Sequence, residues 1–374
     1  MDSLRIALFT DTFDETNGVA HTYRTLADHC HQTGRFLDVF APGSKDSEEV
    51  HGSLKIHRFG RSIGVEYYDD LHFSIVPNRR VAKVFEENGP YDLVQIAAPG
   101  NLGAWGRRLA KKHGLPLVGV HHTMLQDYAA MRAPWFLSEL VRQGSLEILR
   151  RFYRPCHTVL APTPGVADFV RKSGIGRRSD VFSRGVDASR FSPEWRKRTD
   201  RKARLLYVGR LAVEKNLQVL ARILAQVKNS ADCDMVFVGE GPLEAELRQA
   251  LPWARFEGRL RGDALSQAYA DGDIFVFPSM TDTFGNVVNE AQASGVPCVV
   301  MDRNGPGEII TSGQTGLLAP TQESFTEGII ELIRDERSRR EMGQAAASSA
   351  RERSWDKVFE RLWAVYGQVA LSPS

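Results

Sequence analysis

Short apolar runs alternate with segments of helical periodicity along the whole chain, and this alternation restricts the fold more than any other feature. Apolar strands joined by helices belong to parallel sheets that are covered on both faces. In the first half, the predicted strands are Arg5–Phe9, Phe36–Ala41, Asp92–Ala97, Pro116–Val120 and Thr158–Ala161. In the second half, they are Arg204–Val208, Met235–Val238, Ile274–Phe277 and Val296–Val300. The sequence therefore predicts an α/β protein with two successive doubly wound sheets.

The length of 374 residues is too great for one ordinary core, and about two domains of roughly 150 residues are expected. We predict a hinge in Arg184–Pro193 and the charged stretch Glu194–Lys202, because strand-forming sequence resumes directly afterwards. The predicted parts are a first Rossmann-like domain, a second one and a C-terminal helix, at residues 1–185, 186–352 and 353–374. The apolar stripe of that helix, about Ser354–Val369, packs either within the second domain or back on the first.

Composition excludes several classes of function. The formal net charge of +2 argues against a polyanion binder, so no nucleic-acid partner is expected. The cysteines stand alone, without metal-ligand spacing, and no residue is assigned to a metal. The N-terminus enters a strand at Leu4–Phe9, and no apolar run approaches the roughly 20 residues of a membrane span. We expect a cytoplasmic protein, with any membrane contact peripheral and at the inner face of the plasma membrane.

In an open parallel sheet, ligands bind beyond the carboxyl ends of the strands, so the loops after the strands carry the candidate residues. The loop after the first strand ends in Asn17-Gly18 at the start of a helix, where backbone amides favour an anion. Taken alone, this segment is better interpreted as an ordinary turn. His121-His122 follows Pro116–Val120, and one of these two histidines is expected to point into the site.

The loop after Arg204–Val208 carries Gly209, Arg210 and Lys215 close to a helix start. Arginine offers paired donors and lysine a compact charge, so together they can neutralise a departing diphosphate without a divalent ion. The alternative is a pair of solvated surface cations. This alternative has more weight for Lys215 than for Arg210, which is flanked by glycine and apolar residues.

The loop after Ile274–Phe277 is the most informative segment, with Asp282 before a helix and Glu290 inside it. Between them, Phe284-Gly285-Asn286 presents backbone amides at the positive end of the helix. Such amides hold phosphate or sugar hydroxyls, and the two carboxylates accept hydrogen bonds from vicinal diols. Alternatively, Asp282 caps the helix and Glu290 is a solvated helix residue.

Two further carboxylate pairs, Asp232-Cys-Asp234 and Asp271-Gly-Asp273, match a D-x-D pattern that binds Mn²⁺ in other enzymes. Both precede a predicted strand and so lie at the amino edge of the sheet, opposite the candidate site. We interpret them as turn residues. The chain also lacks a G-x-G-x-x-G after its first strand and a G-x-x-x-x-G-K-[ST] loop, which argues against a dehydrogenase or a nucleoside triphosphatase.

In this order and on these loops, the motifs resemble those of family 4 glycosyltransferases, over nearly the whole chain. The segments that carry the resemblance are Asn17-Gly18-Val19, His122-Thr123, Leu206–Asn216, Val238–Pro242, Asp273–Ser279 and the Asp282-to-Glu290 match to the E-x7-E motif, followed by Ala293–Pro297. The resemblance implies the GT-B fold: two Rossmann-like domains facing a deep cleft, and a crossover helix that packs back on the first domain. Within the family, the chain looks closest to GDP-mannose-dependent mannosyltransferases and related glycolipid hexosyltransferases.

The resemblance also implies roles for the candidate residues. It places the donor diphosphate on Arg210 and Lys215, with Gly18 near the distal phosphate. Glu290 is implied to bind the nucleotide ribose, and Leu260 to line the base pocket.

The transferred sugar is implied to lie near His122 and Asp282. Asp282 replaces the first glutamate of the motif and is one methylene shorter, which leaves the donor hexose open. The family retains anomeric configuration. Because no first-domain loop offers a convincing nucleophilic carboxylate, we expect front-face substitution rather than a double displacement. No metal or other cofactor is expected, and the donor is a GDP- or UDP-sugar.

The acceptor is less constrained by the sequence. Arg79-Arg80 with Lys83, and Arg107-Arg108 with Lys111-Lys112, form either a solvated face or a docking site for an anionic membrane. Met124–Arg142 is an acceptor wall, a membrane-contact loop or a buried core helix.

These features favour a retaining hexosyltransferase that moves mannose or a glucose-type sugar to a lipid or sugar acceptor. The alternatives are a nucleotide-sugar epimerase on the same scaffold, a transferase acting on a small soluble acceptor, and a nucleotide-binding regulator without catalysis.

Overall fold

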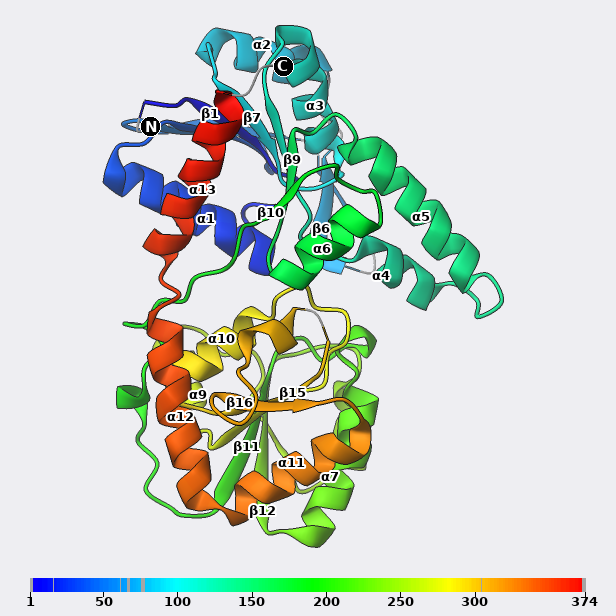
Figure 1. The fold of residues 1–374 in the computed structure, drawn as a ribbon, viewed down its shortest axis with the longest axis vertical. Helices are drawn as coiled ribbons and strands as arrows, with labels where there is room; N and C mark the ends of the chain where they lie inside the picture. The colour runs from blue at the N-terminus through cyan, green and yellow to red at the C-terminus, as the bar shows by residue number, and fades with distance from the viewer. Residues whose placement is uncertain are drawn as a thin grey trace. The chain divides into compact units, whose positions relative to one another are not determined.

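The computed structural model describes residues 3–15, 17–60, 62–65, 68–74, 78–303 and 305–371, without the side chains of 62–65, 68–74 and 78. The chain divides into two compact units. The first unit comprises Met1–Ser183 and Asp356–Ser374, and the second comprises Arg184–Trp355 (Figure 1). Each unit contains a parallel sheet of its own.

The first unit is built on an eight-stranded sheet in the order β10-β9-β8-β7-β1-β2-β4-β3. Its strands are β1 (Ile6–Phe9), β2 (Leu37–Pro42), β3 (Ser47–His51), β4 (Leu54–Phe59), β7 (Leu93–Ile96), β8 (Leu117–Val120), β9 (Thr158–Ala161) and β10 (Ser179–Val181). All neighbours are parallel except β3 and β4. A separate hairpin pairs β5 (Ser62–Val65) with β6 (Tyr68–Ser74). Strands β1, β2, β7, β8 and β9 are buried throughout, as expected of strands covered on both faces.

The described part of the first unit contains seven helices. They are α1 (Gly18–Thr33), α2 (Asn78–Asn88), α3 (Asn101–His113), α4 (Leu125–Arg132), α5 (Ser138–Tyr153), α6 (Pro164–Lys172) and α13 (Trp355–Ala370).

Helix α13, red in Figure 1, lies beside α1, in blue. Arg35 donates to both carboxylate oxygens of Glu360 at 2.8 and 2.9 Å, and its guanidinium lies 4.8 Å from the Trp363 ring. Of the two packings left open for the terminal helix, the structure contains the one on the first unit.

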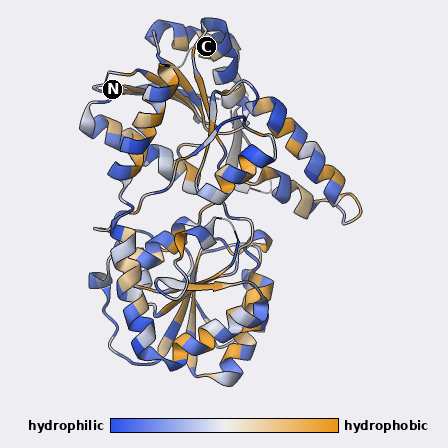
Figure 2. Cartoon of the chain, viewed as in Figure 1, coloured by the Kyte–Doolittle hydropathy of each residue, from blue (hydrophilic) through white to orange (hydrophobic). Residues whose placement is uncertain are grey.

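The second unit has a six-stranded, fully parallel sheet in the order β13-β12-β11-β14-β15-β16. Its strands are β11 (Ala203–Val208), β12 (Cys233–Val238), β13 (Arg255–Phe256), β14 (Ile274–Phe277), β15 (Cys298–Met301) and β16 (Gly316–Ala319). The helices are α7 (Leu217–Ser230), α8 (Glu244–Ala250), α9 (Gly262–Ala270), α10 (Asn286–Ala293), α11 (Gln322–Arg334) and α12 (Glu336–Arg351), with short 3₁₀ turns η1 (Pro193–Trp195), η2 (Val213–Lys215) and η3 (Pro306–Ile309). In Figure 2 the strands are mostly hydrophobic, whereas the helices alternate between hydrophobic and hydrophilic residues.

The strand order places a topological switch point beside β11. The chain passes from β11 outward to β12 and β13, and then returns to β14 on the other side of β11. Loops that leave neighbouring strands in opposite directions open a crevice at the carboxyl edge, which is where ligands bind in such sheets. The candidate residues of the second unit follow β11, β13 and β14, so the fold brings them to this edge.

Every strand predicted from the sequence occurs, with its ends within two residues of the predicted ones. The strands that the apolar pattern does not predict are those at or near the sheet edges, such as β3, which is mostly exposed, and β13, which has two residues. Within the described part of the chain, no helix has both the length and the apolar character to cross a membrane.

Candidate active site

An ion pair joins the loop after β11 to the loop after β14. Lys215 Nζ lies 2.7 and 2.9 Å from the two carboxylate oxygens of Asp282. The hydroxyl of Thr281 donates to the carbonyl oxygen of Glu214 at 3.2 Å and ties the same two loops together. Because β11 and β14 are adjacent strands, the pair sits at the carboxyl edge beside the switch point.

The two candidate cations differ in exposure to solvent. The order is the reverse of the one expected from the sequence, in which Lys215 was the more exposed of the two. The Lys215 side chain is 17% exposed and Asp282 is 20% exposed, so both are largely shielded from water. Arg210 is an exposed residue, although its backbone is held by a 3.0 Å hydrogen bond from Tyr207 Oη to its carbonyl oxygen. The alternative of a solvated surface cation is therefore wrong for Lys215. Neighbouring apolar residues do not predict where a long, flexible side chain ends.

The start of α10 has no side-chain cap among the described residues. Its N-cap is Gly285, in a left-handed conformation with φ of +86°. The alternative role of Asp282 as a helix cap is therefore wrong, because its carboxylate binds Lys215 instead. Phe284 is buried beneath the loop, whereas Gly285 and Asn286 are partly exposed. The first backbone amides of the helix lie where an anion or a hydroxyl oxygen can accept from them.

Glu290 lies on the second turn of α10 and contacts a tyrosine that sequence analysis did not single out. Tyr269, a fully buried residue of α9, donates from its hydroxyl to Glu290 Oε2 at 2.7 Å. Burial raises the pKa of Glu290 to about 7, against opposing contributions from the Tyr269 hydrogen bond and the charge of Arg190. Glu290 is only partly exposed and is hydrogen-bonded to Tyr269, so the alternative of a fully solvated helix residue is wrong for it.

The raised pKa of Glu290 predicts a specific pH dependence of stability. The folded protein keeps the Glu290 proton up to about pH 7, whereas the unfolded chain releases it near its ordinary value of 4.5. The contribution of Glu290 to stability is therefore fully present below about pH 4.5 and is lost as the pH rises through about 7. Glu290→Gln should stabilise the unliganded protein relative to the parent at pH 8, by up to about 3 kcal/mol, and have little effect at pH 4.5.

Thermal unfolding between pH 4.5 and 8 measures this difference. Glu257→Gln, at an exposed glutamate of the same unit, is the control and should leave the pH profile unchanged. Parallel profiles for Glu290→Gln and the parent would contradict the assignment.

The loops after β12 and β13 are bound to the loop after β11. The backbone amide of Gly239 donates to Gly258 O at 2.7 Å, and that of Gly209 donates to Val238 O at 3.0 Å. Gly239 has a φ of +134°, and a Cβ there would lie 2.0 Å from the carbonyl oxygen of Gly209. This close approach fixes the backbone that carries Arg210. Leu260, past the end of β13, packs partly buried against the core of the unit.

Gly305 is a second structural support that the sequence did not reveal. Its φ is +89°, and a Cβ at this position would lie 2.2 Å from the carbonyl oxygen of Asp282. Gly305 therefore underlies the loop that carries Asp282. A glycine before Pro306 is an ordinary turn signal, and nothing in the sequence connects it with a loop about twenty residues away.

In the first unit, Asn17 and Gly18 form the start of α1. Asn17 Oδ1 accepts from the backbone amides of Val19 and Ala20 at 3.0 and 2.9 Å, and its Nδ2 donates to Thr12 Oγ1 at 2.8 Å. The side chain thus serves as a helix cap. With the side-chain oxygen of Asn17 engaged in the cap, the backbone at Gly18 is the part of this segment most suited to contact a donor.

The two adjacent histidines face different helices, consistent with their opposite directions on a strand. His122 Nε2 lies 2.6 Å from the hydroxyl of Tyr23 on α1. The His121 ring packs against Tyr153 of α5 and Phe169 of α6, and burial lowers its pKa to about 4. His121 is therefore a neutral core residue, and His122 stays the prediction for contact with a sugar.

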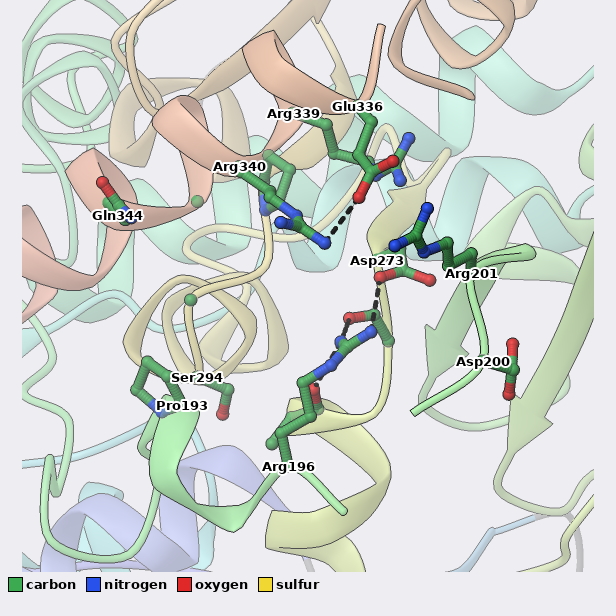
Figure 3. Close-up of a pocket in the computed structure, with 15 residues that line it drawn as sticks. Pro193, Arg196, Asp200, Arg201, Asp273, Ser294, Glu336, Arg339, Arg340 and Gln344 are labelled. Carbon is green, nitrogen blue, oxygen red and sulfur yellow. Dashed lines mark hydrogen bonds and ion pairs between the residues drawn. The ribbon is translucent and has the colours of Figure 1, made fainter. Parts of the chain in front are cut away.

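A pocket of about 410 Å³ in the second unit lies at the amino edge of the sheet, opposite the candidate site (Figure 3). Asp273, directly before β14, is held there by Arg196 at 2.9 Å and by Arg198 at 2.6 Å. Asp234 pairs with Lys202 at 3.1 Å, also at the amino end of its strand. These contacts agree with the interpretation of both D-x-D segments as structural residues.

Two parallel-sheet units of this kind place the protein in the class of two-domain, Rossmann-like proteins with the GT-B fold. Sucrose-phosphate synthase from Thermosynechococcus elongatus has a similar structure, with a TM-score of 0.77 and 17% identity over 98% of this chain and 99% of that one. A glycosyltransferase from Rickettsia africae gives a TM-score of 0.74 with 15% identity, over 99% of this chain and 100% of that one. The predicted GT-B fold is confirmed.

Sequence comparison identifies the family. Residues 16–190 match Glycosyltransferase Family 4, and residues 202–335 match the glycosyl transferases group 1. A GDP-mannose-dependent alpha-mannosyltransferase from Corynebacterium glutamicum is 31% identical over 98% of this chain and 89% of its own length. A protein of the same name from Mycobacterium tuberculosis is 30% identical over 99% and 98%, and a sulfoquinovosyl transferase from Arabidopsis thaliana is 28% identical over 94% and 71%. The chain belongs to glycosyltransferase family 4 and is a hexosyltransferase that uses a nucleotide sugar.

Proposed function

We propose that this protein transfers mannose from GDP-mannose to a glycolipid acceptor, with retention of anomeric configuration and without a divalent metal. The names of the relatives from Corynebacterium and Mycobacterium support the donor. The observation that carries the proposal is the shielded Lys215–Asp282 pair beside the uncapped start of α10. A cation, a carboxylate and helix amides at one edge suit a diphosphate joined to a sugar.

The donor diphosphate is proposed to bind Lys215, Arg210 and the first amides of α10. Lys215 is already desolvated, so its charge acts more strongly on a phosphate than the charge of an exposed lysine would. Arg210 is exposed, and its guanidinium is proposed to supply a bidentate contact after the donor has entered. The backbone at Gly18 is proposed to approach the distal phosphate. Together these groups stabilise the negative charge that develops on the leaving GDP.

The nucleoside is proposed to bind through Glu290 and Leu260. The Glu290 carboxyl accepts from Tyr269 at one oxygen, and the ribose hydroxyls are proposed to donate to the carboxyl as well. Leu260 offers an apolar wall to the base. Donation from two hydroxyls would favour the charged form of Glu290, so donor binding should lower its pKa from about 7.

Asp282 has two proposed partners. In the unliganded protein its carboxylate holds Lys215, which keeps the ammonium near the position of the phosphate. With donor bound, the same carboxylate is proposed to accept from hexose hydroxyls while Lys215 turns toward the phosphate. His122 is proposed to contact the hexose as well.

The proposed reaction is a front-face substitution. The acceptor oxygen attacks the anomeric carbon from the side on which GDP departs, and a phosphate oxygen of GDP takes the acceptor proton. The configuration is retained because both groups occupy the same face. The protein contributes charge stabilisation by Lys215, Arg210 and the α10 amides, and positioning of the two substrates.

A thermal-shift panel of GDP-, UDP- and ADP-sugars tests the donor. GDP-mannose should raise Tm more than the other nucleotide sugars, because at equal concentration a ligand that binds more tightly stabilises the folded state more. Incubation of GDP-mannose without acceptor should give only slow hydrolysis. Conversion into another GDP-hexose would instead favour the epimerase alternative, and a larger shift with a UDP- or ADP-sugar would refute the proposed donor.

The segment between α4 and α5 is proposed to contact a membrane surface. Large apolar side chains are exposed in this segment and on its flanking helices: Trp135 and Phe136 between α4 and α5, Met131 on α4, and Leu140 and Ile148 on α5, with exposed fractions of 87, 66, 52, 71 and 66%. The alternative of a buried core helix is therefore wrong for Met124–Arg142. A lipid interface is the proposed occupant, because tryptophan and phenylalanine at the tip suit the boundary between headgroups and acyl chains and because the proposed acceptor is a lipid.

The two basic clusters offer weaker support for docking. Arg107 donates to the carbonyl oxygens of Arg151 and Phe152, and Arg108 lies over the Trp105 ring at 4.5 Å. Lys112 is paired with Glu86 at 2.5 Å. These contacts favour a structural, solvated face over an anion site.

Liposome co-sedimentation tests the contact at the α4–α5 segment. The parent protein should bind vesicles, and Trp135→Ser/Phe136→Ser should weaken binding by about tenfold, because two exposed aromatic side chains no longer enter the interface. Phe36→Ser, at another partly exposed aromatic of the first unit, is the control. Absence of binding to both anionic and zwitterionic vesicles would exclude membrane docking.

A further inference from the structure

We propose that Tyr23, Gln95 and Tyr366 form a buried hydrogen-bonded chain that positions His122 and fixes the nitrogen on which its ring carries a proton. The inference rests on the proposed function, in which His122 contacts the transferred hexose. It adds three positioning residues that no sequence motif indicates, one of them on the last helix of the chain.

The chain of contacts crosses the first unit from α13 to the loop after β8. The hydroxyl of Tyr366 on α13 donates to Gln95 Oε1 on β7. Gln95 Nε2 donates to the hydroxyl oxygen of Tyr23 on α1 at 3.1 Å. The Tyr23 hydroxyl lies 2.6 Å from His122 Nε2. Four residues that are far apart in sequence thus form one continuous path.

All members of the chain are withdrawn from water. Tyr366, Gln95 and Tyr23 are 0% exposed, and His122 is 8% exposed. Gln95 occupies the middle of a fully buried strand, where an amide without partners would destabilise the fold. Its two hydrogen bonds satisfy that requirement. They also lock the amide in one orientation, because one side meets a tyrosine proton and the other a tyrosine oxygen.

The direction of each hydrogen bond determines the next. Burial raises the pKa of Tyr366 well above its ordinary value, so the hydroxyl keeps its proton and can donate it to Gln95. Gln95 accepts from it through Oε1 and directs its NH₂ group at the oxygen of Tyr23. In the proposed chain, the Tyr23 hydroxyl donates to His122, whose Nε2 accepts at 2.6 Å. A neutral imidazole that accepts at Nε2 carries its proton on Nδ1.

This tautomer gives His122 a defined chemical role. With its proton on Nδ1, the ring is a neutral hydrogen-bond donor at that atom, suited to an oxygen of the hexose or the acceptor. The hydrogen bond from Tyr23 also opposes rotation of the His122 ring, since a flipped ring would present a carbon atom to the Tyr23 hydroxyl. Helix α13 therefore acts on the ring through Tyr366, although it does not contact His122 in this chain of hydrogen bonds.

A double-mutant cycle tests whether the chain acts through His122. Tyr366→Phe should lower kcat about fivefold to tenfold, as expected for the loss of one buried hydrogen bond, and change the donor KM less than twofold. In a His122→Ala background, the same substitution should have no further effect. Tyr91→Phe is the matched control. The Tyr91 hydroxyl donates to Asp38 at 2.6 Å in the same unit, but it does not belong to the hydrogen-bonded chain that leads to His122. Equal losses from Tyr366→Phe in both backgrounds would overturn the proposal.

The ¹⁵N spectrum of His122 gives a second readout that does not depend on activity. The parent should show the Nδ1-protonated tautomer, and Tyr23→Phe, which cuts the last link, should shift the ring toward a mixture of tautomers. An Nε2-protonated ring in the parent, or an unchanged spectrum in Tyr23→Phe, would refute the chain even if no transfer were detectable in any variant. If the spectrum behaves as expected while the parent transfers no hexose, only the proposed function fails.

Discussion

Lys215→Ala is expected to lower kcat for hexosyl transfer by about 10²- to 10³-fold, as expected when a preorganised group that stabilises developing charge is removed. The side chain is largely shielded from water and is held 2.7 Å from Asp282, so its charge acts in a medium that screens it less than bulk water does. Steady-state rates at saturating donor measure the effect. Tm should be measured alongside, because the substitution leaves Asp282 without this partner.

Lys202→Ala is the matched control. Lys202 pairs with Asp232 and Asp234 at the amino end of β12, away from the candidate site. Its removal should change kcat less than twofold. If both variants kept parental turnover, Lys215 would not stabilise the leaving group. Arg210→Ala extends the test to the exposed cation, and an undiminished turnover rate with intact donor affinity would remove Arg210 from the proposed mechanism.

Gly305→Ala is expected to destabilise the second unit by about 3 kcal/mol or more and to reduce transfer. An alanine at a φ of +89° is strained by roughly 1 to 2 kcal/mol, and its Cβ would also lie 2.2 Å from the carbonyl oxygen of Asp282. The backbone of the Asp282 loop has to move to relieve that contact. Chemical denaturation and the kcat of the remaining folded protein measure the two consequences.

Gly313→Ala separates the strain from the collision. Gly313 has a φ of +77°, similar to that of Gly305, but a Cβ there would meet no atom within 4 Å. This variant should lose about 1 kcal/mol and keep its activity. Equal effects of the two substitutions would show that Gly305 does not support the loop.

Much of the architecture follows from local sequence, because buried parallel strands are short apolar runs and the helices between them have a clear period. The Asp282 and Glu290 loop is predictable for the same reason: its spacing relative to a strand end places both carboxylates at one edge. The sequence does not predict which side chains contact these two carboxylates. Tyr269 reaches Glu290 from another helix, and the sequence between them carries no sign of that contact.

Exposure of side chains is the other quantity that the sequence does not specify. Lys215 seemed the better candidate for a surface cation, yet it is shielded because Asp282 follows the adjacent strand. The Tyr23–Gln95–Tyr366 chain illustrates the same limit, since it depends on α13 packing beside α1. The apolar stripe of α13 predicts that the helix is buried, but not against which surface.

The most direct test of the central claim is the rate of mannosyl transfer from GDP-mannose in excess EDTA. If Lys215, Arg210 and the α10 amides together neutralise the leaving diphosphate, the rate should equal that in the untreated protein, and added Mg²⁺ or Mn²⁺ should not increase it more than twofold. Loss of transfer in EDTA, restored by either ion, would contradict charge stabilisation by the protein alone.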